Sequence, residues 1–336
     1  MRAEGVTLGA RVAPNRNQWR ELRKRLLELR LVPLIVGPTA VGKTALSLQL
    51  AEVLGAEIVS ADSRQVYRYM DIGTAKPSRE VRARIPHHFI DVRDPDEYYS
   101  AGEYGREARQ IMARLLEEGR LLIVVGGSGF YLRALIDGLF EPRISDPEVK
   151  ERLRERIRRE GLAAAYRYLM RVDPDSAARI HPHDEQRIVR ALEVYELAGE
   201  PMSKFFARKP APPPFRAMWI GLELPRDELY RRIDHRAEQM FASGLVDEVR
   251  GLLERGYSAD LNALRTVGYQ EVIAHLRGEY SLERAVELVK RNSRRYAKRQ
   301  LTWFRRDERI HWIRADETAS EQILSLLQRA VEAASP

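Results

Sequence analysis

The chain contains no cysteine among its 336 residues, and it contains no long hydrophobic segment. The absence of cysteine excludes disulfide bonds and thiolate metal sites, and it is compatible with a reducing compartment. No apolar run approaches the ~18 residues that a membrane-spanning helix requires, so we expect a cytoplasmic protein without membrane contact. Residues 1–30 are rich in arginine and lack the apolar centre of a secretory signal. We interpret them as an N-terminal extension, with a nucleic-acid tether as the alternative.

Acidic residues are outnumbered by basic ones, 49 against 57, which gives a net charge of +8. Such an excess favours a polyanionic partner without identifying it. The segment 284–314 holds eleven Lys or Arg against three acids, so its net charge equals that of the whole chain. Tyr296, Trp303, Phe304 and Trp312 are interleaved with these cations. Cations beside aromatic rings suit phosphate contacts and base stacking, which predicts a nucleic-acid-binding segment, although an amphipathic helix with an arginine exterior is the alternative.

Short apolar runs alternate with amphipathic segments from Leu31 onward. We expect strands at 31–37, 56–62, 87–92 and 120–127, with helices at 44–55 and 100–119. Apolar strands that alternate with helices are typical of a parallel sheet covered on both faces. The sequence therefore predicts an α/β fold.

The strand pattern is interrupted in the middle of the chain. Residues 145–200 read as helices, a strand pattern returns at 217–224, and helical patterns follow at 226–256 and 281–306. We therefore predict an α-helical insertion between two parts of the sheet domain. The predicted divisions are an extension at 1–30, a core at 31–140, the insertion at 141–208, a core continuation with basic helices at 209–316, and a C-terminal tail helix at 317–336.

Residues 37–44 read GPTAVGKT and stand between a predicted strand and a predicted helix, which fits the G-x-x-x-x-G-K-[ST] pattern. Backbone N–H groups and the N-terminus of the helix form a nest for an anion. Lys43 adds a positive charge, and the Thr44 hydroxyl can ligate Mg²⁺. The predicted phosphate-binding residues are Gly37, Thr39, Ala40, Val41, Gly42, Lys43 and Thr44.

The chain lacks the acidic residue that ends a second strand in many nucleotide hydrolases. The apolar run LLIVVG leads into glycines and Ser128, whereas the acid, Asp62, follows a different strand in the stretch VSADSRQVY. This favours a polyphosphate that is bound as a substrate or leaving group over ATP used as fuel. Asp62 is a candidate Mg²⁺ partner or general base, and Ser63 and Gln65 could bond a base edge. A helix cap with surface polar residues is the alternative.

Two histidine clusters are poor candidates for a metal site. His87 and His88 would point to opposite faces of a strand. His181 and His183 precede a helix that Asp184 is placed to cap. We therefore predict no zinc site.

Six stretches of the sequence together resemble one family. They occur in order from residue 31 to about residue 314 and read GPTAVGKT, SADSRQVYRYMDIGTAKP, HHFIDVRDPDEYYSAGEY, VVGGSGFYLRAL, LRTVGYQE and KRQLTWFRR. In these stretches the chain resembles the tRNA dimethylallyltransferase (tRNA isopentenyltransferase) family. The second and fourth stretches are more specific than the phosphate loop. The resemblance implies a P-loop-kinase-like core with a helical insertion.

The resemblance also implies a reaction. The family transfers the dimethylallyl group from dimethylallyl diphosphate to N6 of adenine 37, beside the anticodon of tRNA, and uses Mg²⁺. The phosphate loop would then hold a diphosphate leaving group. Asp62 matches the general base of the family, Arg236 matches its pyrophosphate arginine, and Ser128 stands at a position near the reacting amine that is often threonine.

The resemblance further implies contacts with the anticodon stem-loop of tRNA, and we expect the protein to be a monomer. The implied tRNA-binding residues are Asp62, Ser63, Arg64, Gln65, Gln186, Arg187, Ile188, Val189, Arg190, Arg265, Gly268, Tyr269, Gln270, Lys298, Arg299 and Trp303. Residues 1–30 fall outside the resemblance.

Three other functions compete with this interpretation. A P-loop kinase would use ATP as phosphoryl donor, but the missing acid and the basic aromatic segment argue against it. A prenyltransferase that acts on free AMP would not need that segment. An RNA-associated nucleotide switch without chemistry would leave Asp62 without a role.

Overall fold

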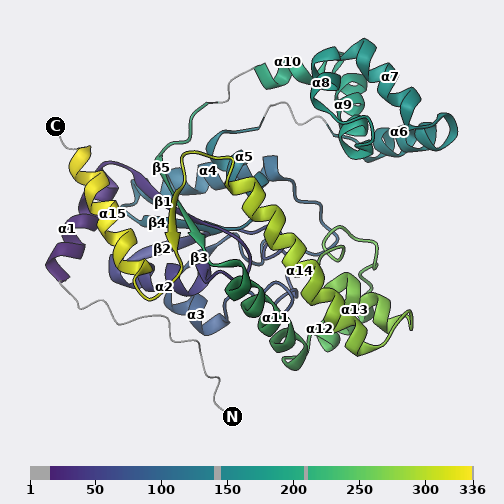
Figure 1. The fold of residues 1–336 in the computed structure, drawn as a ribbon. Coiled ribbons are helices and arrows are strands. Elements are labelled where there is room, and N and C mark those ends of the chain that lie inside the picture. The colour runs from purple at the N-terminus through teal and green to yellow at the C-terminus, as the bar shows by residue number, and fades with distance from the viewer. Residues whose placement is uncertain (1–15, 140–144, 208–210, 335–336) are drawn as a thin grey trace. The chain divides into compact units, whose positions relative to one another are not determined.

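The structure is a computed structural model that describes residues 16–139, 145–207 and 211–334 (Figure 1). The chain divides into two compact units, one formed by residues 1–136 with 213–336 and the other by residues 137–212. The boundaries predicted at 140/141 and 208/209 lie outside the described residues. Each unit is described by itself below.

The first unit is built on a six-stranded sheet of order β3-β2-β4-β1-β5-β6, in which every pairing is parallel. This confirms the predicted α/β fold. The strands are β1 (Leu31–Val36), β2 (Ala56–Ala61), β3 (His87–His88), β4 (Leu121–Gly126), β5 (Arg216–Glu223) and β6 (His311–Arg314).

Two strands differ from the prediction, and both lie at an edge of the sheet. The strand predicted at 87–92 ends after His88, because Phe89 and Asp91 take left-handed backbone conformations with φ of 65° and 56°. The strand β6 was not predicted. Its pattern is weak because Ile313 is its one buried residue.

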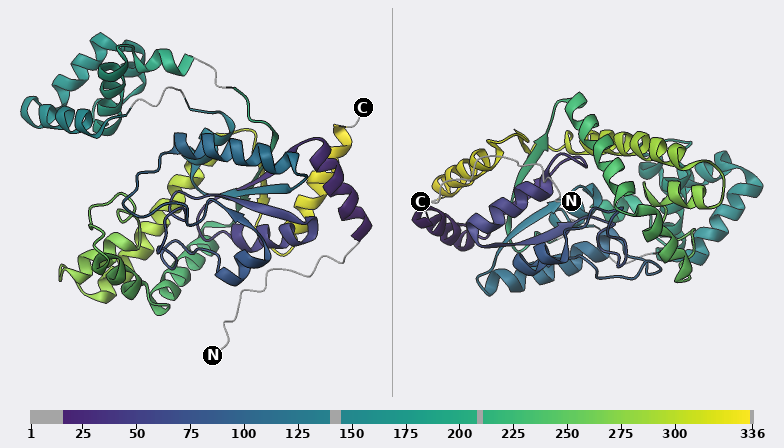
Figure 2. Two further views of the ribbon diagram at one scale, coloured as in Figure 1. Left: turned by 180° about the vertical axis from the view of Figure 1, so that it is seen from behind. Right: turned by 90° about the horizontal axis from the view of Figure 1, so that it is seen from below.

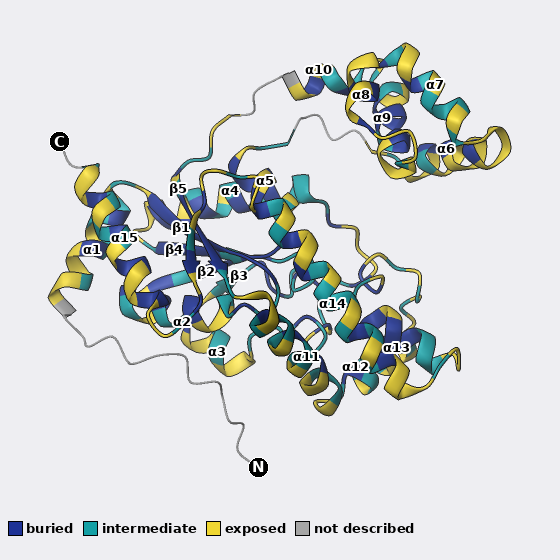
Figure 3. Ribbon diagram, in the orientation of Figure 1, coloured by how far each residue is buried: buried dark blue, intermediate teal, exposed yellow. Residues whose placement is uncertain are grey.

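Helices cover both faces of the sheet (Figures 1 and 2). Residues of β1 alternate between the two faces: Leu34 belongs to one hydrophobic core and Ile35 to the other, and the strands are buried throughout the centre of the sheet (Figure 3). The helices on the Ile35 side are α1 (Arg16–Glu28), α2 (Lys43–Leu54) and α15 (Ala319–Ala333). The helices on the Leu34 side are α4 (Ala101–Glu117) and α5 (Gly129–Ile136).

Helix α1 is part of the packing of the first unit. Leu22 and Leu26 are buried in the same core as residues of α2 and α15. The N-terminal division predicted at residue 30 therefore does not coincide with an edge of the core, because an apolar stripe on residues 16–28 is covered. Residues 1–15 of that division lie outside the described part of the chain.

The remaining helices of the first unit come from both parts of the chain. They are α3 (Arg79–Arg84), α11 (Arg226–Ala242), α12 (Leu245–Glu254), α13 (Tyr269–Leu276) and α14 (Leu282–Phe304). The long basic helix α14 packs against α11, α13 and α5. The helix predicted over 226–256 is two helices, separated at Ser243 and Gly244.

The second unit is helical within its described residues, as predicted. Its helices are α6 (Pro147–Glu160), α7 (Leu162–Val172), α8 (Pro174–Arg179), α9 (Glu185–Ala198) and α10 (Met202–Ala207). They surround a separate hydrophobic core that includes Leu169, Ile188 and Leu192. Asp184 caps α9 by accepting a hydrogen bond from the Arg187 N–H at 3.1 Å. In neither unit does a described helix have the length and apolar character needed to cross a membrane.

Candidate active site

The register of the sheet brings three strand ends together. Val36 of β1 is paired with Gly126 of β4, and Gly126 is paired with Ala61 of β2. The residues that follow these three positions leave the sheet at the same edge, which is where open parallel sheets bind ligands. The phosphate loop, Asp62 and the turn that carries Ser128 therefore stand side by side.

The phosphate loop, residues 37–44, leads into the first turn of α2. Gly42 precedes the helix with φ of 111°, a left-handed conformation that favours glycine. Lys43 Nζ donates to the carbonyl oxygens of Gly37 at 2.9 Å and Pro38 at 2.7 Å. Burial, and then the charge of Arg236, lower the pKa of Lys43 to about 7, while the negative charge of Asp62 acts in the opposite direction. A half-buried lysine held by neutral carbonyls can accept an anion without first breaking an ion pair.

Arg236 reaches this loop from α11. Its Nε atom is buried and has no hydrogen-bond partner among the described residues. Burial lowers the pKa of the Arg236 guanidinium, and Asp62 opposes that shift. Because a buried donor without an acceptor costs free energy, this nitrogen points to a ligand that supplies one.

Three adjoining cavities occupy this edge of the sheet. The first, of about 340 Å³, lies over the phosphate loop and is lined by Lys43, Asp62 and Arg236. The second, of about 410 Å³, shares Asp62 and Arg236 with the first. The third, of about 400 Å³, is lined by Ser128 and aromatic side chains. Tyr296 of α14 lines all three, so the cavities meet at this residue.

Asp62 and Ser128 organise the turn that follows β2. Asp62 Oδ1 accepts from the Arg64 N–H at 2.8 Å, which is a side-chain turn rather than a helix cap. The Ser128 hydroxyl oxygen accepts from the Ser63 N–H at 2.9 Å and donates to the Ser63 hydroxyl at 3.2 Å. Among the described residues, the hydrogen bonds to the Asp62 carboxylate, from the N–H groups of Arg64 and Gln65, both go to Oδ1, so Oδ2 is available to a hydrogen-bond donor of a ligand.

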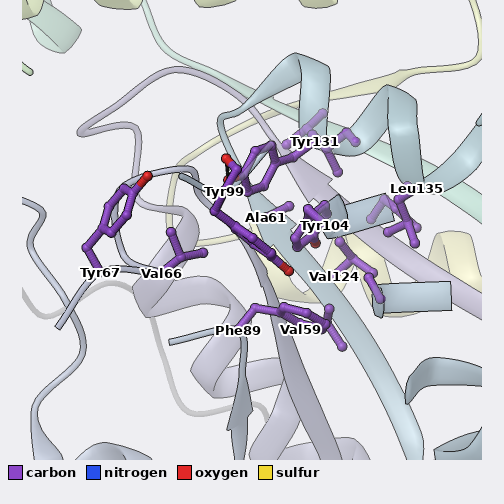
Figure 4. Packing of buried hydrophobic residues seen from close by; sticks show 14 of the residues in the cluster. Val59, Ala61, Val66, Tyr67, Phe89, Tyr99, Tyr104, Val124, Tyr131 and Leu135 are labelled. Atoms are coloured by element: carbon purple, nitrogen blue, oxygen red, sulfur yellow. Dashed lines mark hydrogen bonds between the residues drawn. The ribbon is translucent and has the colours of Figure 1, made fainter. Parts of the chain in front are cut away.

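A cluster of aromatic residues packs next to this turn (Figure 4). The rings of Tyr104 and Tyr131 are stacked with centroids 4.3 Å apart, and Phe89 meets Tyr104 edge-on at 5.1 Å. Burial raises the pKa of both tyrosine hydroxyls well above its ordinary value, and the charge of Asp62 adds to both shifts. Two neutral phenols in a packed cluster provide a rigid support that does not compete with Asp62 for protons.

Two residues on α14 belong to segments that were predicted to bind nucleic acid but were not singled out as residues of this site. Tyr296 lines the three cavities, and burial, followed by the charge of Asp62, raises its pKa to about 12. Gln300 is buried and accepts from the N–H of Thr39 in the phosphate loop. The signal for both was their spacing with Trp303, since positions 296, 300 and 303 share one face of a helix.

Part of the predicted tRNA-binding set lies around the second and third cavities. Gln65 is held by internal contacts, since Nε2 donates to the Thr74 carbonyl at 3.3 Å and Oε1 accepts from the Ser60 hydroxyl at 3.1 Å. Lys298 is exposed on α14. Gln65 lines the first cavity, and the members that line the second and third cavities are Asp62, Ser63, Arg64, Arg265, Gln270, Arg299 and Trp303.

Four other members of that set are buried. Ile188 and Val189 belong to the core of the second unit, and Tyr269 belongs to the core of the first. The Tyr269 hydroxyl donates to Glu248 at 2.6 Å. Gly268 is also buried. The predicted stretches thus alternate between core and surface positions, and these four buried residues are not exposed for contact with a partner.

The other predicted residues on α9 lie in the second unit. Gln186 and Arg187 are exposed, whereas Arg190 is half-buried and pairs with the buried Glu193 at 2.7 Å. Of these three residues, Gln186 and Arg187 are thus the exposed ones, and Arg187 also pairs with Asp184 at 3.2 Å.

The described residues contain no group of three or more His, Cys, Asp or Glu that could hold a metal ion. Two oxygen groups near the phosphate loop could ligate a metal ion: the exposed Thr44 hydroxyl and the Asp62 carboxylate, which both line the first cavity. Mg²⁺ is commonly bound by one or two protein oxygens together with substrate phosphates. The residues present therefore fit a Mg²⁺ ion that is held jointly with a diphosphate.

Comparison with known proteins identifies one family. Residues 65–307 match the family model described as IPP transferase. The tRNA dimethylallyltransferases of Geobacter sulfurreducens and Geobacter metallireducens are each 50% identical over 267 residues, which cover 79% of this chain and 86% of the relative.

Solved structures agree with this result. The tRNA isopentenylpyrophosphate transferase of Bacillus halodurans matches with a TM-score of 0.68 and 38% identity, covering 90% of this chain and 97% of the other. A eukaryotic dimethylallyltransferase acting on tRNA matches with a TM-score of 0.76 and 27% identity, covering 91% of this chain and 80% of the other.

Proposed function

The chain belongs to the IPP transferase family, and on that basis we propose that it transfers the dimethylallyl group of dimethylallyl diphosphate to N6 of adenine 37, next to the anticodon of tRNA. The product is N6-isopentenyladenosine within the tRNA. One observation carries the proposal: the phosphate loop, Asp62 and the inner face of α14 line adjoining cavities that meet at Tyr296. This arrangement offers an anion site and a base within reach of one bound nucleoside.

The proposed reaction exchanges one bond for another. The bond between C1 of the dimethylallyl group and the diphosphate oxygen breaks, and its electron pair leaves with the diphosphate. The adenine N6 forms a new bond to C1 and loses a proton, which Asp62 accepts. The unpartnered Oδ2 of Asp62 supports this role, since the other oxygen is held by the Arg64 N–H.

The leaving group gains negative charge as the C–O bond breaks. The loop N–H groups, Lys43 and Arg236 are placed to stabilise that charge in the first cavity. The Thr44 hydroxyl would hold Mg²⁺, which supplies further positive charge to the diphosphate oxygens when it is bound. The diphosphate is released intact, so the missing second-strand acid of nucleotide hydrolases is not required.

The adenine amine is a weak nucleophile, so positioning has to supply much of the rate. The base must leave the anticodon stack to reach Asp62, and exposed aromatic side chains are a suitable surface for it. The ring centroids of Trp303 and Phe130 lie 4.7 Å apart, and both residues line the third cavity together with Arg299. Ser128 acts there by holding the turn that carries Asp62.

A transfer assay tests this function. Purified protein is incubated with Mg²⁺, labelled dimethylallyl diphosphate and unmodified tRNA, with free AMP and ATP in parallel reactions. We expect label on adenine 37, a loss of about 10²-fold or more in rate for Asp62→Asn, and no transfer after chelation of Mg²⁺. The matched control is Asp227→Asn, which changes an exposed carboxylate on α11 and should react like the wild type.

Each competing function predicts a different result. Label on AMP but not on tRNA would assign the protein to prenyltransferases that act on free nucleotides. Phosphoryl transfer from ATP without prenyl transfer would assign it to the kinases. Binding of tRNA without transfer of label, by the wild type and by Asp62→Asn alike, would leave the carboxylate without a chemical role and would favour a binding protein.

A further inference from the structure

We propose that Gln300 of α14 is a positioning residue that holds the phosphate loop and the β4–α5 turn in a fixed place relative to the RNA-facing side of α14. The inference deepens the transfer reaction proposed above and rests on it. Gln300 does not touch the reacting atoms. It acts through the segments that carry them.

The side-chain amide of Gln300 bridges three segments. Its Oε1 accepts from the Thr39 N–H at 2.8 Å, and its Nε2 donates to the Gly127 carbonyl at 3.0 Å. The residue is 7% exposed, so these bonds are shielded from water. A glutamine amide can serve both partners at once because its oxygen accepts and its nitrogen donates.

The close approach at Gly127 depends on this side chain. A Cβ atom at Gly127 would lie 2.3 Å from Gln300 Nε2, whereas the nearest atom of any other residue would be the Gly37 oxygen at 3.4 Å. Gly127 is not among the residues with positive φ, so its backbone can accept alanine. Alanine at this position would therefore displace the Gln300 amide and disturb little else.

The hydrogen bonds of Gln300 affect the residues one turn before and one turn after it on α14. Tyr296 and Trp303 occupy the same face of α14 as Gln300 and line the cavities that hold Asp62 and Ser128. The seating of α14 at Gln300 thus sets the distance between a nucleoside held by α14 and a diphosphate held by the loop. Misplacement by about 1 Å can reduce a rate about 10²-fold. The loss should appear in kcat, since each substrate keeps its own binding residues.

The test is a double-mutant cycle on prenyl transfer to tRNA with Gln300→Ala, Gly127→Ala and the double variant. We expect each single variant to lose about tenfold or more in kcat, with KM for each substrate changed by less than about threefold. The double variant should lose no more than Gln300→Ala alone, because the atoms that alanine 127 would meet are gone. Gln322→Ala, an exposed glutamine on α15, is the matched control and should behave like the wild type.

A kcat of Gln300→Ala equal to that of the wild type would overturn the inference. So would a fold-loss in kcat of the double variant equal to the product of the losses of the two single variants. If Gln300→Ala does not fold, Gln300→Glu replaces it. That variant keeps an oxygen that accepts from the Thr39 N–H and loses the N–H that donates to the Gly127 carbonyl. Its kcat should therefore lie below that of the wild type. Amide exchange at Thr39 gives a readout besides activity, and we expect faster exchange in Gln300→Ala. A wild-type protein that transfers no prenyl group would overturn the proposed function, while unchanged exchange at Thr39 would overturn the bridge.

Discussion

At the scale of the residue, Lys43 is a lysine whose pKa is shifted down by its surroundings to about 7 from an ordinary 10.5. Between these two values the unfolded chain binds a proton at Lys43 that the folded chain does not bind. The ligand-free protein should therefore gain stability as pH rises from about 7 to about 10.5, and the full penalty should be present below pH 7. We expect the free energy of unfolding of wild type minus that of Lys43→Met to increase over this range. Urea denaturation at a series of pH values measures it.

The control for this prediction is Lys24→Met, which removes an exposed lysine of α1. The difference between wild type and this variant should be independent of pH over the same range. A flat profile for Lys43→Met as well would mean that the loop lysine titrates like a surface lysine.

At the scale of the element, the structure places five of the basic residues of α14 in two sets. Lys290 and Arg294 pair with carboxylates of α11. Arg291, Arg295 and Lys298 are exposed, have no carboxylate partner among the described residues, and share one helical face. We expect Arg295→Ala to weaken tRNA binding and to reduce the slope of log K against log [salt] by about 1. Filter binding between about 50 and 200 mM salt measures the slope.

Lys290→Ala is the matched control on the same helix, because its ammonium group already has a carboxylate partner. Its salt slope should equal that of the wild type. Equal reductions for both variants would mean that the whole helix contributes through its net charge and not through one face.

At the scale of the whole molecule, the two units have separate hydrophobic cores. Glu193 is fully buried in the second unit, where it accepts from the Asp146 N–H at 2.8 Å and pairs with Arg190. We expect Glu193→Ala to destabilise this unit by about 2 kcal/mol, less than for a fully buried pair because Arg190 reaches solvent. Calorimetric unfolding and pyrophosphate binding, measured together, test whether the first unit is unaffected.

Glu196→Ala provides the comparison, since Glu196 pairs with an exposed arginine and should contribute about 1 kcal/mol or less. If Glu193→Ala lost pyrophosphate affinity at a temperature where the first unit is folded, the two hydrophobic cores would not be independent of each other.

The sequence by itself determined the features that local patterns encode. The strand at 31–36, the glycine-rich loop with Lys43, and the helix that ends at Gly55 follow from periodicity and from residues with special backbone preferences. The family also followed from local stretches, since six short motifs in order identify it. Edge strands were less well predicted: β3 is shorter than expected and β6 was missed, because a short, half-exposed strand has little apolar pattern.

Only the tertiary structure decided which of these residues meet. Gln300 lies 261 positions from Thr39 and 173 from Gly127, yet its amide joins both. It also decided which arginines of α14 are paired and that Ile188 and Val189 face a core. These outcomes depend on strand register and helix packing, which arise from contacts between distant segments. A short stretch of sequence specifies its own periodicity, but its partners are chosen by the fold that buries its apolar face.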